Sequence, residues 1–83
     1  PLYTYLSRAY VQQGKFDDAV KRAQQGALLP PVTAEALFFL GDAYQKRNGA
    51  GDLQRAREAY QSALEVNPSY AEAQQALSGL PQQ

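Results

Sequence analysis

The 83-residue chain has no cysteine and no histidine. Disulfide bonds are therefore excluded, and the soft ligands of structural zinc sites and the most common general base of enzymes are missing. A chain of this length buries only about 60 % of the surface that it exposes when unfolded. Without disulfides or a zinc site, its fold must depend on side-chain packing alone.

The chain also lacks an excess of charge of either sign, and it lacks long apolar runs. Lys plus Arg and Asp plus Glu number eight each, so the formal net charge is zero. This balance argues against general electrostatic binding to nucleic acid or anionic lipid. No apolar run approaches the roughly 20 residues of a membrane helix, so we expect no membrane insertion of this segment. The chain also begins at Pro1 and has no methionine, and we expect it to be part of a longer protein.

The chain contains an internal repeat. Its two copies align with an offset of 34 residues as far as Tyr44 and of 37 residues from Gly51 onward, with Asn48, Gly49 and Ala50 as the insertion. Insertions between otherwise matching patterns fall in turns. Residues matching in type are Tyr3, Leu6, Ser7, Tyr10, Gly14, Ala19, Ala23, Gly26 and Pro31 in the first copy, and Leu37, Leu40, Gly41, Tyr44, Gly51, Ala56, Tyr60, Ala63 and Pro68 in the second.

Apolar residues recur at steps of three and four along each copy, as in Leu2, Tyr3, Leu6 and Tyr10. This spacing indicates amphipathic helices. Glycine-containing turns and prolines separate the apolar segments and predict where each helix ends. The predicted helices are 2–13, 16–28, 34–47, 52–66 and 70–78.

Side chains that cap helices and side chains that allow close packing also follow the repeat. Thr33, Asp52 and Ser69 are candidate N-caps, and Ser69 with Glu72 predicts a capping box. Asp17 and Asp18 stand four residues before Lys21 and Arg22, a spacing that predicts ion pairs on a helix surface. The residues expected where two helices approach closely are Ser7, Ala19, Gly41, Ala56 and Ala63.

This pattern resembles the tetratricopeptide repeat. The sequence departs from the family at Tyr3 and Leu37, where tryptophan is usual, at Ala23, where an aromatic residue is preferred, and at Gly26, where alanine is preferred. The resemblance implies an all-α fold of antiparallel helix-turn-helix repeats stacked as a short right-handed superhelix. The expected units are a first repeat at 1–33, a second at 34–70, and a capping helix and tail at 71–83 whose polar face carries Gln74, Gln75, Gln82 and Gln83.

The resemblance also implies the function of a non-catalytic module that binds a peptide segment of a protein partner in a concave groove, without a cofactor, in a scaffold or assembly protein. Phe38 and Phe39 are adjacent, so we expect at least one of them to face the groove; the alternative is that they wedge between neighbouring first helices and are buried. The groove positions carried over are Thr4, Tyr5, Arg8, Val11, Gln12, Glu35, Phe38, Phe39, Asp42, Gln45 and Lys46, and the capping helix would add Glu72, Gln75 and Ala76. One subfamily holds the terminal carboxylate of its peptide with a clamp of Lys, Asn and Arg side chains. This binding mode is disfavoured here, because the corresponding positions are Thr4, Arg8, Phe39, Glu72 and Ala76.

Two alternatives remain open at this level. The chain could instead be a structural spacer or a self-association element that uses the uncapped first helix face with Leu2, Tyr3 and Tyr10. The cations around the 48–51 turn could accept an acidic partner, or they could form a solvated edge. These cations are Lys46, Arg47, Arg55 and Arg57.

Overall fold

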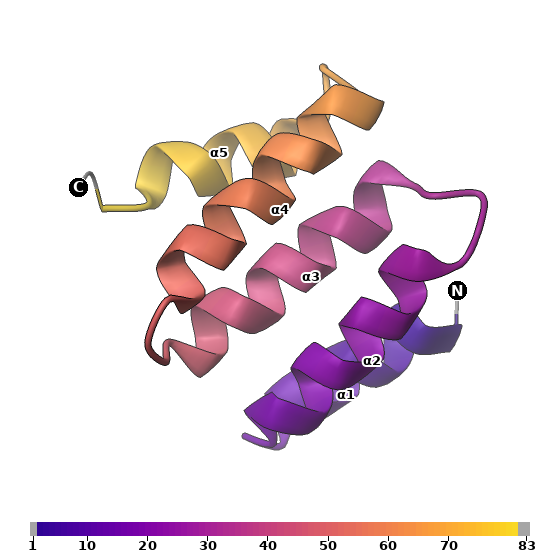
Figure 1. Cartoon of the computed structure of the whole chain (residues 1–83), viewed down its shortest axis with the longest axis vertical. Coiled ribbons are helices and arrows are strands. Elements are labelled where there is room, and N and C mark those ends of the chain that lie inside the picture. Colours follow the sequence, from indigo (N-terminus) through magenta and orange to yellow (C-terminus); the bar gives the residue numbers. More distant parts are fainter. Residues whose placement is uncertain (1, 82–83) are drawn as a thin grey trace.

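The computed structural model describes residues 2–81 as a stack of antiparallel helices (Figure 1). The central helix α3 lies between the α1–α2 pair and α4, and α5 packs on the far side of α4. The helices are α1 (Leu2–Gln12), α2 (Phe16–Leu28), α3 (Ala34–Arg47), α4 (Asp52–Val66) and α5 (Ala71–Gly79). The predicted all-α fold class is confirmed, and each predicted helix boundary is correct to within one residue.

The turn between α1 and α2 is closed by Gly14, whose φ of +75° lies in the left-handed region. Its N–H donates to the carbonyl of Val11 over 3.0 Å, and the N–H of Lys15 donates to the carbonyl of Tyr10 over 2.9 Å. These two bonds satisfy carbonyls at the end of α1 in the Schellman arrangement, which favours glycine at this position.

The turn between α3 and α4 absorbs the three-residue insertion. Asn48 ends α3 in the left-handed conformation, with φ of 54°, and its N–H donates to the carbonyl of Tyr44 over 2.9 Å. Gly51, with φ of +79°, then precedes α4. The helices on both sides keep their register because the extra residues are accommodated outside them.

The two helices of each pair meet at the small residues that the repeat pattern marks, and all five of these residues are buried. In the first pair, Ser7 Oγ donates to the carbonyl of Ala19 over 2.9 Å. In the second pair, the ring of Tyr60 lies against Gly41 so closely that a β-carbon there would be 2.6 Å from Tyr60 Cε1. The two pairs therefore differ at this crossing: the serine of the first pair bonds to a backbone carbonyl of α2, whereas the glycine of the second pair leaves room for the ring of Tyr60.

Of the three predicted N-caps, only Thr33 is one. Its side chain accepts a hydrogen bond from the N–H of Ala36 over 3.1 Å. Asp52 is the first residue of α4, not its cap, and its carboxylate is turned into the molecule. The Ser69–Glu72 capping box is also absent, because Tyr70 occupies the cap position of α5 and Ser69 Oγ donates to Asn67 Oδ1 instead.

The last helix covers the end of the second pair. Ala73 and Leu80 are buried there, with Ala76 and Leu77 partly buried against the same core, while Gln74 and Gln75 are exposed. Gln82 and Gln83 lie outside the described residues. Between residues 2 and 81, no helix has the length and apolar character needed to cross a bilayer.

Candidate functional site

The predicted groove residues lie on α1 and α3, but their side chains differ in solvent exposure. On α1, Tyr5 is 69 % exposed, and Arg8 and Gln12 are also exposed. These side chains line a shallow hollow of about 160 Å³ together with Ala9. The structure therefore brings three predicted groove residues together around one depression.

Arg8 joins this hollow to α3. Its guanidinium carbon lies 5.1 Å from the ring centroid of Phe39, within the range of a cation–π contact. Phe39 is half-buried, so the arginine shields a ring that would otherwise be more open to solvent. The two first helices thus present one continuous surface of aromatic and cationic character.

Phe38 and Phe39 have different environments although they are adjacent. Phe38 packs into the core, with its ring centroid 5.6 Å from that of Tyr60 and 5.8 Å from that of Tyr70. The rings of Phe38 and Phe39 meet edge to face at 5.0 Å. Phe39 is the member of the pair that lies toward α1 and Arg8, because successive helical residues point about 100° apart.

Three predicted groove residues face other helices. Thr4 is buried, with its Oγ1 3.7 Å from where a β-carbon would stand on Gly26. Val11 packs on the core cluster shared by α2 and α3. Gln45 is half-buried and accepts a hydrogen bond from the Tyr60 hydroxyl over 2.8 Å. Thr4 is therefore not accessible to a peptide in this structure, whereas Val11 and Gln45 are half-buried and their place in a groove stays a prediction.

The remaining predicted residues form the charged part of the surface. Asp42 and Lys46 are one helical turn apart and pair over 2.9 Å. Glu35 is exposed at the start of α3. Within residues 2–81, neither Arg8 nor Glu35 takes part in an ion pair, so both charges on this surface are available to a partner.

A buried carboxylate, that of Asp52, organises the α3–α4 turn; its closeness in sequence to the cations indicated that it would offset their charge, but not that it is buried. Asp52 is 1 % exposed; its carboxylate accepts from Nε and Nη2 of Arg47 over 2.8 and 2.9 Å, and from Arg55 Nη1 over 3.0 Å. The N–H of Gly49 also donates to it over 2.9 Å. Hydrogen bonding by Arg47 is the main cause that keeps the pKa of Asp52 far below its usual range, against the opposing effect of burial.

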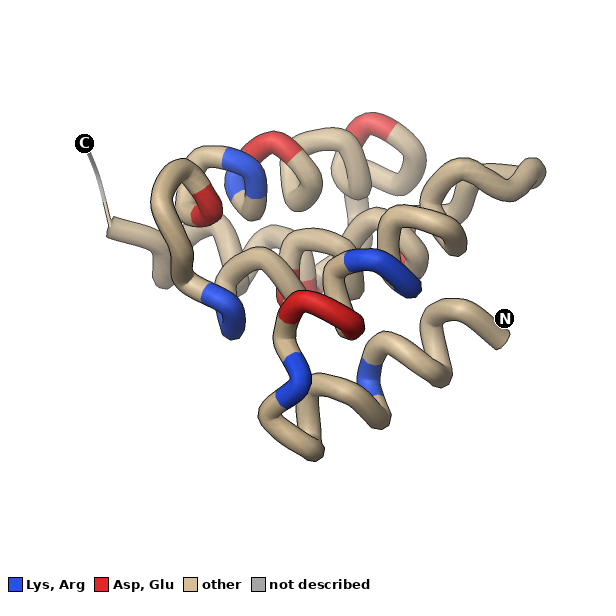
Figure 2. Tube along the Cα trace, turned by 60° about the horizontal axis from the view of Figure 1, so that its bottom comes forward, with Lys and Arg blue, Asp and Glu red and all other residues tan. Residues whose placement is uncertain are grey.

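The ion pairs around the turn bear on whether its cations could accept an acidic partner. Arg47 pairs with both Asp52 and Asp17, and Arg55 pairs with Asp52, so two carboxylates balance the two guanidinium groups, while Lys46 pairs with Asp42. Arg57 donates to the carbonyl of Pro81 over 2.6 Å. Figure 2 shows Lys and Arg interspersed with Asp and Glu along the trace, without a long stretch of either sign. An acidic partner therefore finds no open cluster of cations at this end of the described chain.

Ion pairs on α2 also differ from the prediction. Asp17 pairs with Arg47 over 3.1 Å rather than with Lys21. Arg22 bonds to the amide oxygen of Gln25 rather than to Asp18. The Asp17 contact spans 30 residues, so the one-turn spacing on α2 could not indicate it.

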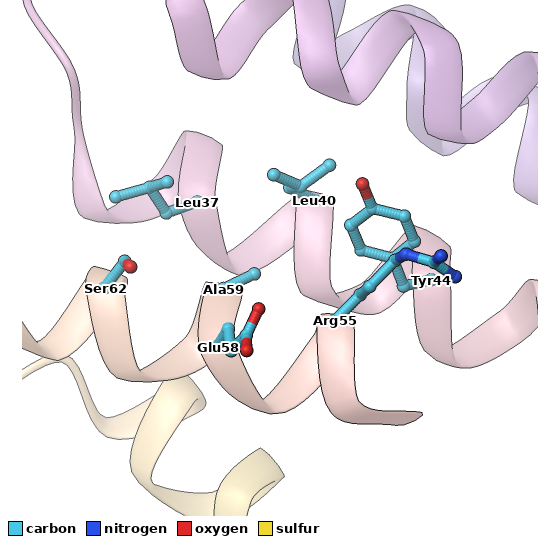
Figure 3. Close-up of a pocket in the computed structure, with 7 residues that line it drawn as sticks. All are labelled: Leu37, Leu40, Tyr44, Arg55, Glu58, Ala59 and Ser62. Carbon is cyan, nitrogen blue, oxygen red and sulfur yellow. The ribbon is translucent and has the colours of Figure 1, made fainter. Parts of the chain in front are cut away.

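A second hollow, of about 240 Å³, is lined by residues of α3 and α4 (Figure 3). Leu37, Leu40 and Tyr44 project from α3 into the space between α4 and the neighbouring pair. The residues that α4 contributes are Arg55, Glu58, Ala59 and Ser62. This hollow is where the apolar stripe of α3 remains partly open between α2 and α4.

Stacked antiparallel helix pairs with small residues at each crossing, and with an accessible surface on the first helices, define a helical-repeat protein. The family model described as "Tetratricopeptide repeat" matches residues 6–49 and 49–79. The chain therefore belongs to the tetratricopeptide repeat family, as its sequence pattern indicated. Tetratricopeptide repeats generally mediate protein–protein interaction and are typically non-catalytic. A search of curated proteins found no match to the chain.

Proposed function

We infer that this domain binds a peptide segment of a partner protein on the surface formed by α1 and α3. The observation that carries this inference is the position of Arg8 over Phe39, beside the hollow that Tyr5 and Gln12 line. Such a surface offers a large aromatic area next to a charge, a combination enriched at protein interfaces.

The charges of this surface favour a particular ligand chemistry. The Asp42–Lys46 pair is neutral overall, whereas Arg8 has no carboxylate partner in the described part of the chain. A ligand carboxylate can accept from Arg8, and a neighbouring aliphatic or aromatic side chain can occupy the hollow beside Tyr5. The preferred segment therefore carries an acidic residue next to an apolar one.

Binding by this surface alone is expected to be weak. Standard protein–protein interfaces engage about 20–30 residues on each side, more than the exposed faces of two helices provide, so micromolar affinity is the expected range. In a scaffold or assembly protein, a second binding site on the same chain would raise the overall affinity through effective concentration.

Panning a phage-displayed library of random peptides on the isolated domain tests this function. We expect enrichment of peptides with an acidic residue beside an apolar one. Arg8→Ala and Phe39→Ala should each weaken the selected peptide about tenfold, which corresponds to loss of one interface anchor. Unchanged affinity in both variants, at unchanged helicity, would show that the α1–α3 surface is not the binding site.

Arg22→Ala is the matched control for Arg8→Ala. Arg22 lies on α2 and bonds only to the neighbouring Gln25 in the described structure, so its removal deletes the same charge away from the proposed surface. We expect this variant to bind the peptide as the wild type does.

The alternative function is self-association through the first helix face. The exposed apolar surface of that face is smaller than the sequence suggested. Tyr10 packs on the core cluster of α2 and α3, and Tyr3 is half-buried with its β-carbon near Gly26. Of the three residues named for it, Leu2 alone is largely exposed, at 66 %. The α1–α3 surface is the better-supported site.

A further inference from the structure

The aromatic surface that begins at Arg8 and Phe39 continues across α3 to the start of α5. The ring centroid of Phe38 lies 5.0 Å from that of Phe39 and 5.8 Å from that of Tyr70, the residue before α5. All three aromatic side chains are half-buried, so each leaves part of its surface to solvent. We name Phe39, Phe38 and Tyr70 the aromatic row. The guanidinium of Arg8 lies at one end of this row, 5.1 Å from Phe39.

Two glutamates lie at the other end of the aromatic row. Glu35 is the second residue of α3 and Glu72 the second residue of α5. Both side chains are exposed. Burial raises the pKa of the Tyr70 hydroxyl, and the negative charges of Glu72 and Glu35 raise it further. Both carboxylates therefore act on one tyrosine, although they belong to different helices.

The position of these glutamates in first helical turns has a local explanation, because the N-terminus of a helix stabilises a carboxylate. Their lack of a cation does not follow from it. Asp17 and Asp52 also stand in first turns, and each pairs with an arginine. Within residues 2–81, neither Glu35 nor Glu72 forms an ion pair. The two carboxylates beside Tyr70 are therefore available to a cation of a partner.

We propose that the α1–α3 surface extends along the aromatic row onto the start of α5, and that it binds a peptide with opposite charges at its two ends. An acidic residue of the peptide pairs with Arg8, and a lysine or arginine of the peptide lies between Glu35 and Glu72, against the ring of Tyr70. This ligand is a more specific form of the one in the proposed function, on which the inference rests.

The chemistry of each end favours this order of charges. A lysine or arginine can donate to both carboxylates while its cation or its alkyl chain lies against the tyrosine ring. An acidic residue there would meet two like charges, and a basic residue at Arg8 would meet one. The charges therefore fix which end of the peptide lies on α1 and which on α5.

The length of the aromatic row sets the spacing between the two charged residues of the peptide. The steps from Arg8 to Phe39, Phe38 and Tyr70 are 5.1, 5.0 and 5.8 Å. The guanidinium and the Tyr70 ring are thus at most about 16 Å apart, the length of about five extended residues. The acidic and basic residues of the peptide should therefore stand no more than about five positions apart.

Titration of the domain with short peptides, followed by amide chemical shifts, tests the inference. The probe is acetyl-Lys-Ala-Ser-Ala-Asp-Leu-amide, and its reversed sequence is tested alongside because the order of charges fits a backbone of either direction. The tighter of the two is compared with the same peptide carrying glutamine in place of lysine. The glutamine peptide should bind the wild type about threefold to tenfold more weakly, as expected for exposed ion pairs. Shifts that require the lysine should lie at residues 34–36 and 70–73.

The double variant Glu35→Gln with Glu72→Gln should bind the lysine peptide as weakly as the wild type binds the glutamine peptide. Its affinity for the glutamine peptide should be unchanged, which separates a lost contact from a misfolded variant. A preference for lysine that persists in the double variant would overturn the inference. Glu65→Gln is the matched control and should leave both affinities unchanged, because Glu65 is exposed on α4, outside this surface, and forms no ion pair in the described part of the chain.

Arg8→Ala separates this inference from the proposed function. If both peptides bind the wild type equally well and Arg8→Ala weakens both, the glutamates take no part in binding, and the inference alone is overturned. If Arg8→Ala leaves both affinities unchanged, or if neither peptide binds at concentrations up to about 10 mM, the proposed function fails and the inference fails with it.

Discussion

Arg47 at the end of α3 donates a hydrogen bond to Asp17 in the first turn of α2, over 3.1 Å. The same guanidinium donates two bonds to the buried Asp52. One side chain therefore connects the first repeat to the inserted turn of the second. Of the two carboxylates, Asp52 is the one on which stability depends, because Asp17 is 92 % exposed and water competes for its bond.

Asp52→Asn should lower the free energy of unfolding by about 2–3 kcal/mol, measured by urea denaturation. Removing one partner of a buried ion pair costs about 3–5 kcal/mol, and partial exposure of Arg47 and Arg55 reduces the loss. Asp42→Asn is the control, because its pair with Lys46 is a one-turn surface pair worth about 0.5 kcal/mol or less. Equal losses in the two variants would contradict a special role for Asp52.

Acid should reduce the stability of the wild type more than that of Asp52→Asn. The pKa of Asp52 is lowered in the folded state by Arg47, so its contribution is fully present above the unfolded pKa of about 3.9 and is lost as the pH falls toward the folded pKa. Urea midpoints at about pH 7, 4 and 2.5 should therefore converge for the two proteins on acidification. A difference that stays constant over this range would argue against the lowered pKa.

Gly41→Ala should destabilise the domain by about 1–2 kcal/mol. The new β-carbon would meet Tyr60 Cε1 at 2.6 Å and Cδ1 at 2.7 Å, and Tyr60 is held by its hydroxyl bond to Gln45. Overpacking costs about 1–3 kcal/mol, of which the better helix propensity of alanine recovers up to about 1 kcal/mol.

Gly79→Ala is the control for that substitution, because a β-carbon at Gly79 meets no atom within 4 Å. Thermal melting should show a lower Tm for Gly41→Ala and no decrease for Gly79→Ala. A Gly41→Ala protein as stable as the wild type would mean that the Tyr60 ring can move away from α3.

Thr33→Ala should lower stability by about 1 kcal/mol, since the threonine side chain accepts the N–H of Ala36 at the start of α3. Ser69→Ala should change it by less than about 0.5 kcal/mol, because Ser69 makes no such bond to α5. Denaturant midpoints of the two variants distinguish a residue that caps a helix from one that is only of a type common at caps. A larger loss in Ser69→Ala would contradict this assignment.

The candidate surface was predictable in part. The repeat register placed Tyr5, Arg8 and Gln12 on the accessible side of α1, and this is where they lie. The same register also assigned Thr4 to the groove, although Thr4 is buried, and Val11, which is half-buried against the core. A register defines which positions are equivalent, but it does not define the rotation of a helix against its neighbours, and exposure depends on that rotation.

The role of Asp52 could not be predicted from its local sequence pattern. Its place before an apolar segment was typical of an N-cap, since Asp is common at that position. A signal for its actual role existed in the arginines that precede and follow it at positions 47 and 55. Whether they reach the carboxylate depends on how the inserted turn folds back, and no local pattern describes that.

The sequence by itself determined the helices, their turns and the family, because helical periodicity, glycine turns and proline stops act between residues a few positions apart. Tertiary structure alone decided which of two adjacent phenylalanines approaches Arg8, and that Arg47 reaches Asp17. These features arise between residues up to 31 positions apart in the chain, at Arg8 and Phe39. Their distances follow from how whole helices pack, and packing is a property of the assembled fold.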